Sequence, residues 1–497
     1  MSREAAALLR EAKEHVRHGR GADAIRLARR ASAATSDPFT AALNLGGILI
    51  DGGTDEKDPR LVREGVRRLV GVAGHVRPGA EAVYHYNLGN GYSALAHWER
   101  GSGPGTRPSL DLAISNLDES LQHSEFPDAR TNLANTLMQQ GRPVEALDEY
   151  EIVLGSNTNH HQALANRGRA LIEMKRWLPD HGALLSAALA DHRRALDLAV
   201  NEPVFAASYQ RLIAWLEPQV TPFEPTRKEP TAYEAWIWGN RLALNPCPVC
   251  RVDTPDCFDL YPLAGRLAAK RRIPPESVVL DIVNRLCQAF ATARWVLYSA
   301  NQESSAGDHQ VFVPSENRSR FGLSSGLLMS ACTGFYSVLN NTAFALDSYF
   351  RLHMNPQAVS LSTVWYKTPR SKGSPISRAD IRPRLLTPPN PGLTALYGLS
   401  RSLERGKGRY FHLRDLRNSI EHHIVVVTTA PSGMNSYFRS VNTLELSTKA
   451  IQLGRVAKAA IWYFAAAVYH AEGFRARRAT KSGIPVVFGR GPSVRRA

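Results

Sequence analysis

The chain has 497 residues and a formal net charge of +16, with 43% hydrophobic and 21% charged side chains. This length exceeds what one ordinary core supports, and the composition excludes a largely disordered chain, so at least two globular domains are expected. The longest apolar run, residues 459–469, has about half the length of a membrane-spanning helix, which predicts a buried core helix and no membrane partner.

The first twenty residues mix charged and apolar side chains at helical spacing. They lack the uninterrupted apolar segment of a secretory signal. Only five cysteines are present, too few for a disulfide framework in a chain of this size. These features predict a cytoplasmic protein.

A helical unit recurs in residues 1–205. Its clearest copy is residues 127–160, where Ala134, Gly141 and Ala146 let two helices approach closely and Tyr150 fills the groove between them. The length of 34 residues and this spacing resemble a tetratricopeptide repeat (TPR). Related units lie at residues 21–31, 42–47, 86–121 and 161–203.

Four to five such units would stack into a solenoid with a concave face. TPR arrays carry no chemistry of their own, so a protein or peptide partner is expected on this face. The alternative is an irregular helical bundle.

Residues 206–232 are rich in proline and are predicted to be a linker. A second domain is expected over residues 233–475, followed by a basic tail at residues 476–497. Its helical patterns make the predicted fold class all-α. The expected helices are residues 276–300, 324–350, 393–405, 413–423 and 443–471.

The positive charge is confined to the second part of the chain. Residues 1–230 carry 27 Lys and Arg against 29 Asp and Glu, whereas residues 231–497 carry 34 against 16. Such a basic field attracts polyanions, and nucleic acid is the first candidate. The alternative is a general arginine-rich composition in which the extra charges lie on a solvated surface. Such a composition would have raised the net charge of both parts.

Residues 413–423 read LRDLRNSIEHH, in which Arg417 is followed directly by Asn418 and, five positions on, by His422. Imidazole can give or take a proton near neutral pH, and guanidinium is a charged fork that matches phosphate oxygens. Asn418 lies one helical turn before His422 and could orient it or a phosphate. Arg417 and His422 are about 140° apart on an ideal helix, so Arg417 would have to reach round it. The alternative is that Arg417 pairs with Glu421 and His422 is only a helix-end residue.

This element resembles the signature of HEPN nucleases, which is an arginine, a polar residue, three or more variable positions and a histidine. Residues 233–472 also resemble the HEPN type that is fused to TPR arrays in bacteria. The segments that carry this likeness are residues 234–246, 291–300, 340–350, 362–367, 393–403 and 442–467.

The resemblance implies a helical bundle that forms homodimers, with the Arg/His elements of two protomers facing one cleft. It implies cleavage of RNA without a metal or cofactor, by attack of the ribose 2′-hydroxyl on the adjacent phosphate. His422 would act as acid or base, Arg417 would bind the phosphorane charge, and Asn418 would position one of them. Asp347, on an earlier helix, would be brought toward this element.

Basic residues just before the element are expected to bind the RNA backbone. They are Arg405, Lys407, Arg409 and Arg414.

Cys247, Cys250 and Cys257 have half of the spacing of a zinc ribbon, and Cys287 or His309 would have to complete the ligand set. The alternative is a turn shaped by neighbouring prolines, with thiols that act as small apolar groups. No motif of a P-loop, a zinc metalloprotease or a serine esterase is present.

The sequence thus predicts a ribonuclease controlled through its repeats, in a toxin, stress or antiviral-defence setting that the resemblance alone implies. A non-catalytic scaffold for RNA or protein is the main alternative. A repeat-based sensor that acts on transcription is a third hypothesis, although no helix-turn-helix signature is present.

Overall fold

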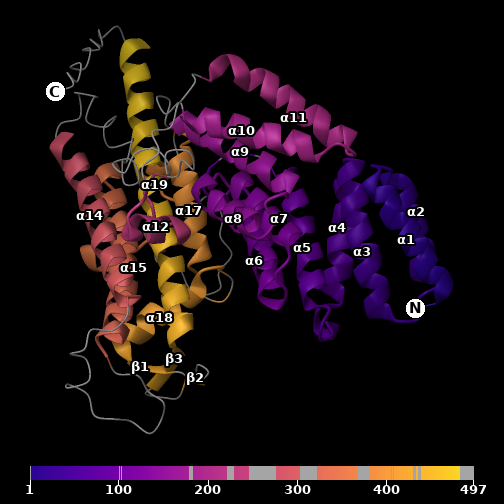
Figure 1. Ribbon diagram of the computed structural model, residues 1–497, viewed down its shortest axis with the longest axis horizontal. Helices are drawn as coiled ribbons and strands as arrows, with labels where there is room; N and C mark the ends of the chain where they lie inside the picture. Colours follow the sequence, from indigo (N-terminus) through magenta and orange to yellow (C-terminus); the bar gives the residue numbers. More distant parts are fainter. Residues whose placement is uncertain are drawn as a thin grey trace.

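The computed structural model describes residues 2–481 except for 100, 102, 178–182, 221–228, 246–275, 303–321, 368–379, 387, 405, 407, 429–432 and 435–437. Two helical parts lie side by side (Figure 1). The first, α1 to α11, is called the repeat array below, and the second, α12 to α19, is called the C-terminal bundle.

The helices of the repeat array follow one another as hairpins, each packed against its neighbours in the chain. They are α1 (Arg3–Arg17), α2 (Gly21–Ala33), α3 (Pro38–Asp55), α4 (Pro59–Gly71), α5 (Glu81–Leu95), α6 (Pro108–His123), α7 (Pro127–Gln139), α8 (Pro143–Ser156), α9 (His161–Trp177), α10 (Ala183–Leu198) and α11 (Pro203–Leu216).

The unit at residues 127–160 has the predicted form. Pro127 and Pro143 begin α7 and α8, where a fixed φ suits the first helical turn and the missing N–H costs nothing. Gly141 turns the chain between them with φ of +77°, which an L side chain rarely adopts. In the next unit a Cβ at Gly168 would lie 2.4 Å from the His192 ring, so only glycine lets α9 and α10 approach this closely.

The repeat array extends further than the predicted boundary at residue 205. α11 continues to Leu216 and packs on α10, and α12 begins at Ala232. The predicted array end at residue 205 therefore lies eleven residues before the end of α11, whereas the four prolines of the predicted linker all follow that helix.

The C-terminal bundle is built around one long, almost wholly buried helix. Its helices are α12 (Ala232–Gly239), α14 (Glu276–Ala300), α15 (Leu323–Phe350), α16 (Pro383–Leu386), α17 (Pro391–Ser402), α18 (Phe411–His422) and α19 (Thr443–Lys481). α14, α15 and α17 pack around α19, whose residues 459–468 are fully buried. This confirms the predicted core helix, and no described helix is long and apolar enough to cross a membrane.

A small sheet joins α18 to α19 and was not predicted from the sequence. Its strands are β1 (Ile424–Thr428), β2 (Gly433–Met434) and β3 (Phe438–Asn442). β3 is central, parallel to β1 and antiparallel to β2. The run of β-branched residues in β1 is the physical reason that the chain leaves the helix after His422.

The two parts share one continuous apolar core that reaches from Ile114 in the repeat array to Ala471 in the C-terminal bundle. α6 and α8, the second helices of two repeats, contact α17 and α19. The ring of Trp177 meets that of Tyr463 edge on, with centroids 6.0 Å apart. The repeat array is therefore packed firmly against the bundle.

Hydrogen bonds and ion pairs accompany this apolar contact. Arg142 of the array is fully buried, and its Nη1 donates to Ser402 Oγ of the bundle at 2.9 Å. Lys458 Nζ lies 2.8 Å from Asp148 Oδ1, and Arg401 Nε lies 3.0 Å from an oxygen of Asp111. Part of the basic excess of the second half thus neutralises acidic residues of the first.

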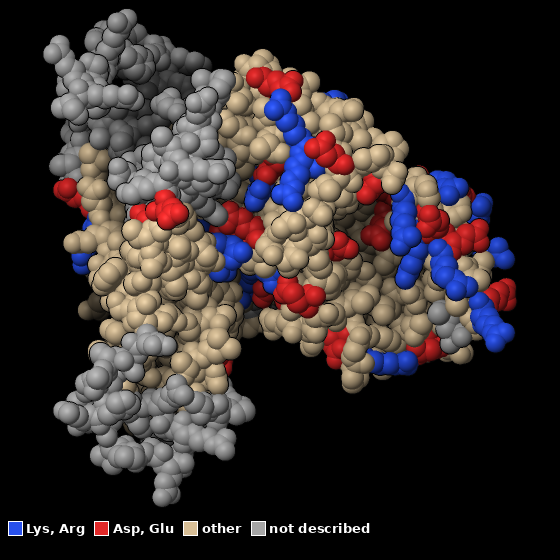
Figure 2. All heavy atoms as spheres, viewed as in Figure 1, with Lys and Arg blue, Asp and Glu red and all other residues tan. Residues whose placement is uncertain are grey.

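Figure 2 shows charged side chains interspersed over the repeat array, with few over α14 and α15 on the same face. Among the described residues on this face, the basic excess of the second half forms no broad patch.

Candidate functional site

α18 carries the Arg–Asn–His element and is held by its apolar side. Leu413 and Leu416 are fully buried, at the spacing of one helical face. The helix ends at His422, because His423 has extended backbone angles and leads into β1.

Arg417 is partly exposed and has three neighbours. Its Nη2 lies 2.5 Å from Glu421 Oε2, and its Nη1 donates to Asn418 Oδ1 at 3.1 Å. The guanidinium also stacks 5.0 Å from the centre of the Tyr336 ring on α15. Burial raises the pKa of the Tyr336 phenol, so the ring stays uncharged beneath the cation. Arg417 thus forms the ion pair with Glu421 that was the structural alternative to a catalytic role.

His422 is exposed at the last position of the helix. Within the described part of the chain its side chain makes no hydrogen bond or ion pair, and Asn418 binds Arg417 rather than the histidine. His422 is therefore open to solvent and to a ligand.

Asp347 is not brought to this element within one chain. It lies eleven residues after Tyr336 on α15, about 16 Å along the helix axis. Its Oδ1 accepts the backbone N–H of Met354 at 3.1 Å, so the carboxylate caps the turn that follows α15.

Arg439 was not singled out from the sequence, yet it secures α18 from behind. Its Nη1 lies 2.7 Å from Asp415 Oδ2 and donates to Ser419 Oγ at 2.7 Å. This ties β3 to α18 and fixes the end of the helix where His422 stands. In the sequence, Arg439 is simply a basic residue that follows the Arg–Asn–His element. Its spacing from that element does not indicate a role.

Arg409, which was expected to bind RNA, is an ion-pair partner in the joint between the two parts. Arg409 is buried, with its Nε 2.9 Å from Asp118 Oδ1 and its Nη2 2.5 Å from Glu149 Oε1. Carboxylates thus occupy Nε and Nη2 of Arg409, which also borders the cleft between the two parts. Arg405 and Lys407 lie outside the described residues.

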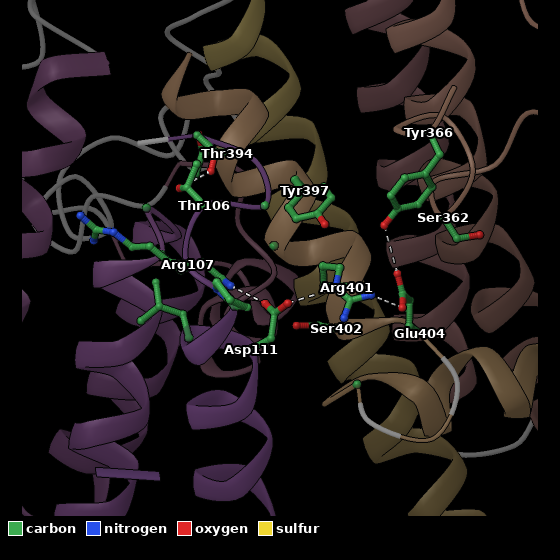
Figure 3. A pocket seen from close by; sticks show the side chains of 18 of the residues that line it. Thr106, Arg107, Asp111, Ser362, Tyr366, Thr394, Tyr397, Arg401, Ser402 and Glu404 are labelled. Atoms are coloured by element: carbon green, nitrogen blue, oxygen red, sulfur yellow. Dashed lines mark hydrogen bonds and ion pairs between the residues drawn. The ribbon is translucent and has the colours of Figure 1, made fainter. Parts of the chain in front are cut away.

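Arg414 lines a cleft of about 1880 Å³ between the two parts. Figure 3 shows Asp111 and Arg401 meeting in this cleft, with Glu404, Tyr366 and Tyr397 beside them. Asp111 and Gln140, joined by a hydrogen bond from Nε2 to Oδ1 of 2.7 Å, belong to the repeat array, whereas Tyr397 and Arg401 belong to α17. Both parts of the chain therefore line the cleft.

Three arginines on the cleft wall have no carboxylate partner among the described residues. They are Arg107, Arg382 and Arg414. Arg382 Nε donates to the Val364 carbonyl at 3.1 Å, and Arg107 Nε is buried without a hydrogen-bond partner in the described part of the chain. The cleft wall therefore offers cationic groups to an anion.

The proposed zinc cysteines Cys247, Cys250 and Cys257, and His309, lie outside the described residues. Cys287 is half-buried and Cys332 is buried. Burial raises the pKa of the Cys332 thiol to about 12, which makes it an unreactive core group.

The described residues include one cluster with metal-ligand chemistry, formed by His85, Glu119 and His123 in the repeat array. The cluster is hard to recognise in the sequence, because its ligands come from two helices. The spacing of Glu119 and His123, one turn apart on α6, was the available signal.

Comparison with known families identifies both parts. Residues 272–471 match the family model described as LA2681-like HEPN, and residues 9–67 match that of the tetratricopeptide repeat. The second domain is therefore a HEPN domain, and the N-terminal part contains TPR repeats, as predicted.

Among solved structures, a thermophilic TPR protein of Thermus thermophilus is 16% identical, over 42% of this chain and 99% of its own, with a TM-score of 0.34. PilF of Pseudomonas aeruginosa is 20% identical, over 43% of this chain and 92% of its own, with a TM-score of 0.28. No curated protein matches the chain.

Proposed function

We propose that the HEPN domain is a metal-independent endoribonuclease whose reaction depends on Arg417, Asn418 and His422. The observation that carries the proposal is the exposed surface of α18, where Arg417 and Asn418 are hydrogen-bonded to each other and a solvent-open histidine follows on the same helix. These groups suit phosphate binding and proton transfer.

The reaction would proceed by attack of a ribose 2′-oxygen on the adjacent phosphorus. The 2′-hydroxyl proton passes to a base, the bond from phosphorus to the 5′-oxygen breaks, and an acid protonates that oxygen. The products are a 2′,3′-cyclic phosphate and a 5′-hydroxyl end. Arg417 would stabilise the negative charge that gathers on the phosphoryl oxygens.

One α18 supplies one His422, whereas the reaction needs both a base and an acid. A homodimer that places two α18 helices across one cleft would provide both groups. This is the assembly that the HEPN resemblance implies, and we propose it as the active form.

Glu421 is the ion-pair partner of Arg417 when no RNA is bound. A phosphate that binds Arg417 must therefore replace Glu421, at least in part, as the partner of the guanidinium. A half-exposed ion pair of this kind is worth about 1 kcal/mol or less, so an RNA phosphate can replace it. We propose that Glu421 holds Arg417 in place until RNA binds.

The interdomain cleft would guide the RNA to this element. Arg414, Asn418 and His422 are spaced four residues apart on α18, which puts them on one helical face. Arg414 lines the cleft, so a strand bound by the cleft arginines could continue along this face to His422.

A protein or peptide that binds the repeats would use the face that the HEPN domain leaves open. The second helices α6 and α8 are occupied by that domain. On the first helices, Asn132 Nδ2 donates to Asn90 Oδ1 at 3.0 Å and Asn166 Nδ2 donates to Asn135 Oδ1 at 2.9 Å. This row of side-chain amides suits the backbone of an extended peptide. Binding of such a peptide would control the nuclease, in a toxin, stress or antiviral-defence setting.

The second candidate function is a non-catalytic scaffold for RNA or protein. The Arg417–Glu421 ion pair favours it, because an arginine that remains paired would serve only the fold. In that case RNA binding would occur without cleavage.

Incubation of the full chain with total RNA in EDTA separates the two candidates. Catalysis predicts new fragments with 2′,3′-cyclic phosphate and 5′-hydroxyl ends. Intact RNA under conditions in which it is bound would support the scaffold. Activity that vanished in EDTA and returned with magnesium would contradict the metal-independent mechanism.

A further inference from the structure

Two Glu-x-x-x-His pairs lie on neighbouring helices of the repeat array. Glu81 and His85 are one turn apart on α5, and Glu119 and His123 are one turn apart on α6. Residues at this spacing share a helical face, and α5 packs directly on α6. The two pairs therefore converge at one edge of the array.

Three of these side chains already have the geometry of a ligand set. The candidate ligand atoms of His85, Glu119 and His123 all lie within 4.8 Å of one another. His123 Nε2 is 3.5 Å from Glu119 Oε1, and the two imidazole rings are parallel to within 3° with centroids 6.1 Å apart. Ligands that share one zinc ion at its usual bond lengths lie about 3.3 Å apart, so small side-chain rotations would close the set.

A neighbouring amide fixes the tautomer of His85. Asn116 Nδ2 donates to the Leu112 carbonyl at 2.8 Å, which aims its Oδ1 at the histidine. His85 Nδ1 lies 3.0 Å from this oxygen, and an amide oxygen can only accept, so Nδ1 carries the proton. The lone pair of Nε2 is then free to bind a metal, an arrangement common among metal-ligating histidines.

The local charge suits a dication. Glu81 lies one helical turn before His85 on the same face of α5. Glu81 thus adds a second carboxylate beside that of Glu119. The two carboxylates would balance the positive charge of a bound dication.

We propose that His85, Glu119 and His123 bind a single zinc ion, with the remaining coordination position taken by water or by Glu81. Two imidazoles and one carboxylate suit zinc and its neighbours in the transition series, whereas magnesium and calcium prefer oxygen ligands.

This site would clamp the hairpin that joins the two domains. Glu119 directly follows Asp118, whose carboxylate binds Arg409 of the HEPN domain at 2.9 Å. A metal that ties α5 to α6 would therefore stiffen the helix on which the domain joint rests. The site belongs to the TPR array and takes no part in the RNA cleavage proposed above.

The test uses the full chain, stripped of metal with EDTA, dialysed and titrated with zinc chloride by calorimetry. Cys247, Cys250 and Cys257 are replaced by serine in all samples, so that a cysteine site cannot contribute. One equivalent of zinc should bind and should raise the unfolding temperature. His85→Ala, His123→Ala and Glu119→Gln should each weaken binding by more than about 100-fold, because loss of a ligand exceeds the effect of losing its supporting partner.

Asn116→Ala should weaken zinc binding by about 10- to 100-fold, since it removes only the group that orients His85. His75→Ala, an exposed histidine outside the cluster, should bind zinc normally, and circular dichroism should show unchanged helicity in every variant. The proposal is overturned if the serine-substituted chain binds no zinc, or if binding survives both His85→Ala and His123→Ala. Glu119→Gln is the nearest change in size, so its loss of zinc with helicity intact would exclude simple unfolding.

Discussion

Arg409 of the HEPN domain and Glu149 of α8 form an ion pair across the joint between the domains, with Nη2 2.5 Å from Oε1. Both side chains are more than nine-tenths buried. Arg409 also binds Asp118, and Glu149 also binds Arg130. Because a buried charge is costly without its partner, this network specifies how the two domains meet.

Glu149→Ala should destabilise the chain by about 3 kcal/mol, because it leaves Arg409 buried with one partner fewer. Urea unfolding measures this loss. Glu64→Ala removes a surface carboxylate that pairs with Arg29 and Arg68 and should cost less than about 1 kcal/mol. Equal stability of the two variants would mean that the joint does not depend on the buried pair.

Glu149 should also make the unfolding free energy depend on pH. Burial opposes its ionisation, but Arg409 and Arg130 outweigh burial and lower the pKa of Glu149 from 4.5 to about 2. A folded pKa below the unfolded one stabilises the fold above pH 4.5, and this stability is lost as the pH falls toward 2. At neutral pH it amounts to about 3 kcal/mol.

Glu149→Gln cannot ionise at this position and serves as the reference. The difference in unfolding free energy between wild type and Glu149→Gln should shrink as the pH is lowered from 7 to 3. A difference that stayed constant over this range would show that Glu149 has an ordinary pKa in the folded chain.

Arg414→Glu should weaken RNA binding and lower the slope of log affinity against log salt by about one or more, because a phosphate contact is lost. Arg26→Glu, at an exposed position on α2, provides the matched charge reversal in the repeat array and should change RNA affinity little. Filter binding at several salt concentrations compares the two. Equal losses would mean that RNA is held by overall charge and not by the cleft.

Glu421→Gln should tighten RNA binding several-fold, because Arg417 loses a competitor worth up to about 1 kcal/mol. RNA affinity measured in EDTA is the readout, with Glu119→Gln, a carboxylate on the repeat array, as the control. Weaker binding by Glu421→Gln would assign Glu421 a supporting role in the RNA complex.

Much of this architecture could be predicted from the sequence, because it rests on local patterns. The helix pair around Gly141, the long buried helix α19 and the position of α18 all follow from spacing of small and apolar residues. The small sheet is harder to predict from local patterns. β1 is only five residues long, and its partner β3 does not follow it directly in the sequence.

The joint between the domains was beyond sequence reasoning for a different reason. Arg409 and Arg414 are five positions apart in one basic stretch, yet Arg409 is buried in ion pairs with Asp118 and Glu149, whereas Arg414 has no carboxylate partner among the described residues. Only the packing of α6 and α8 on the HEPN domain separates them. Asp347 likewise has a structural role that depends on the turn after α15.

The most direct test of the proposed nuclease compares His422→Ala with its neighbour His423→Ala. His422 is exposed, so alanine should change the unfolding free energy by about 0.5 kcal/mol or less. Cleavage of RNA in EDTA, measured as single-turnover rate, should fall by about two to four orders of magnitude. His423→Ala should retain most of the activity, and Arg417→Lys should recover little of what Arg417→Ala loses, because an ammonium lacks the two-pronged contact. Wild-type cleavage by a folded His422→Ala chain would contradict a catalytic role for His422 and leave the HEPN domain as a binding module.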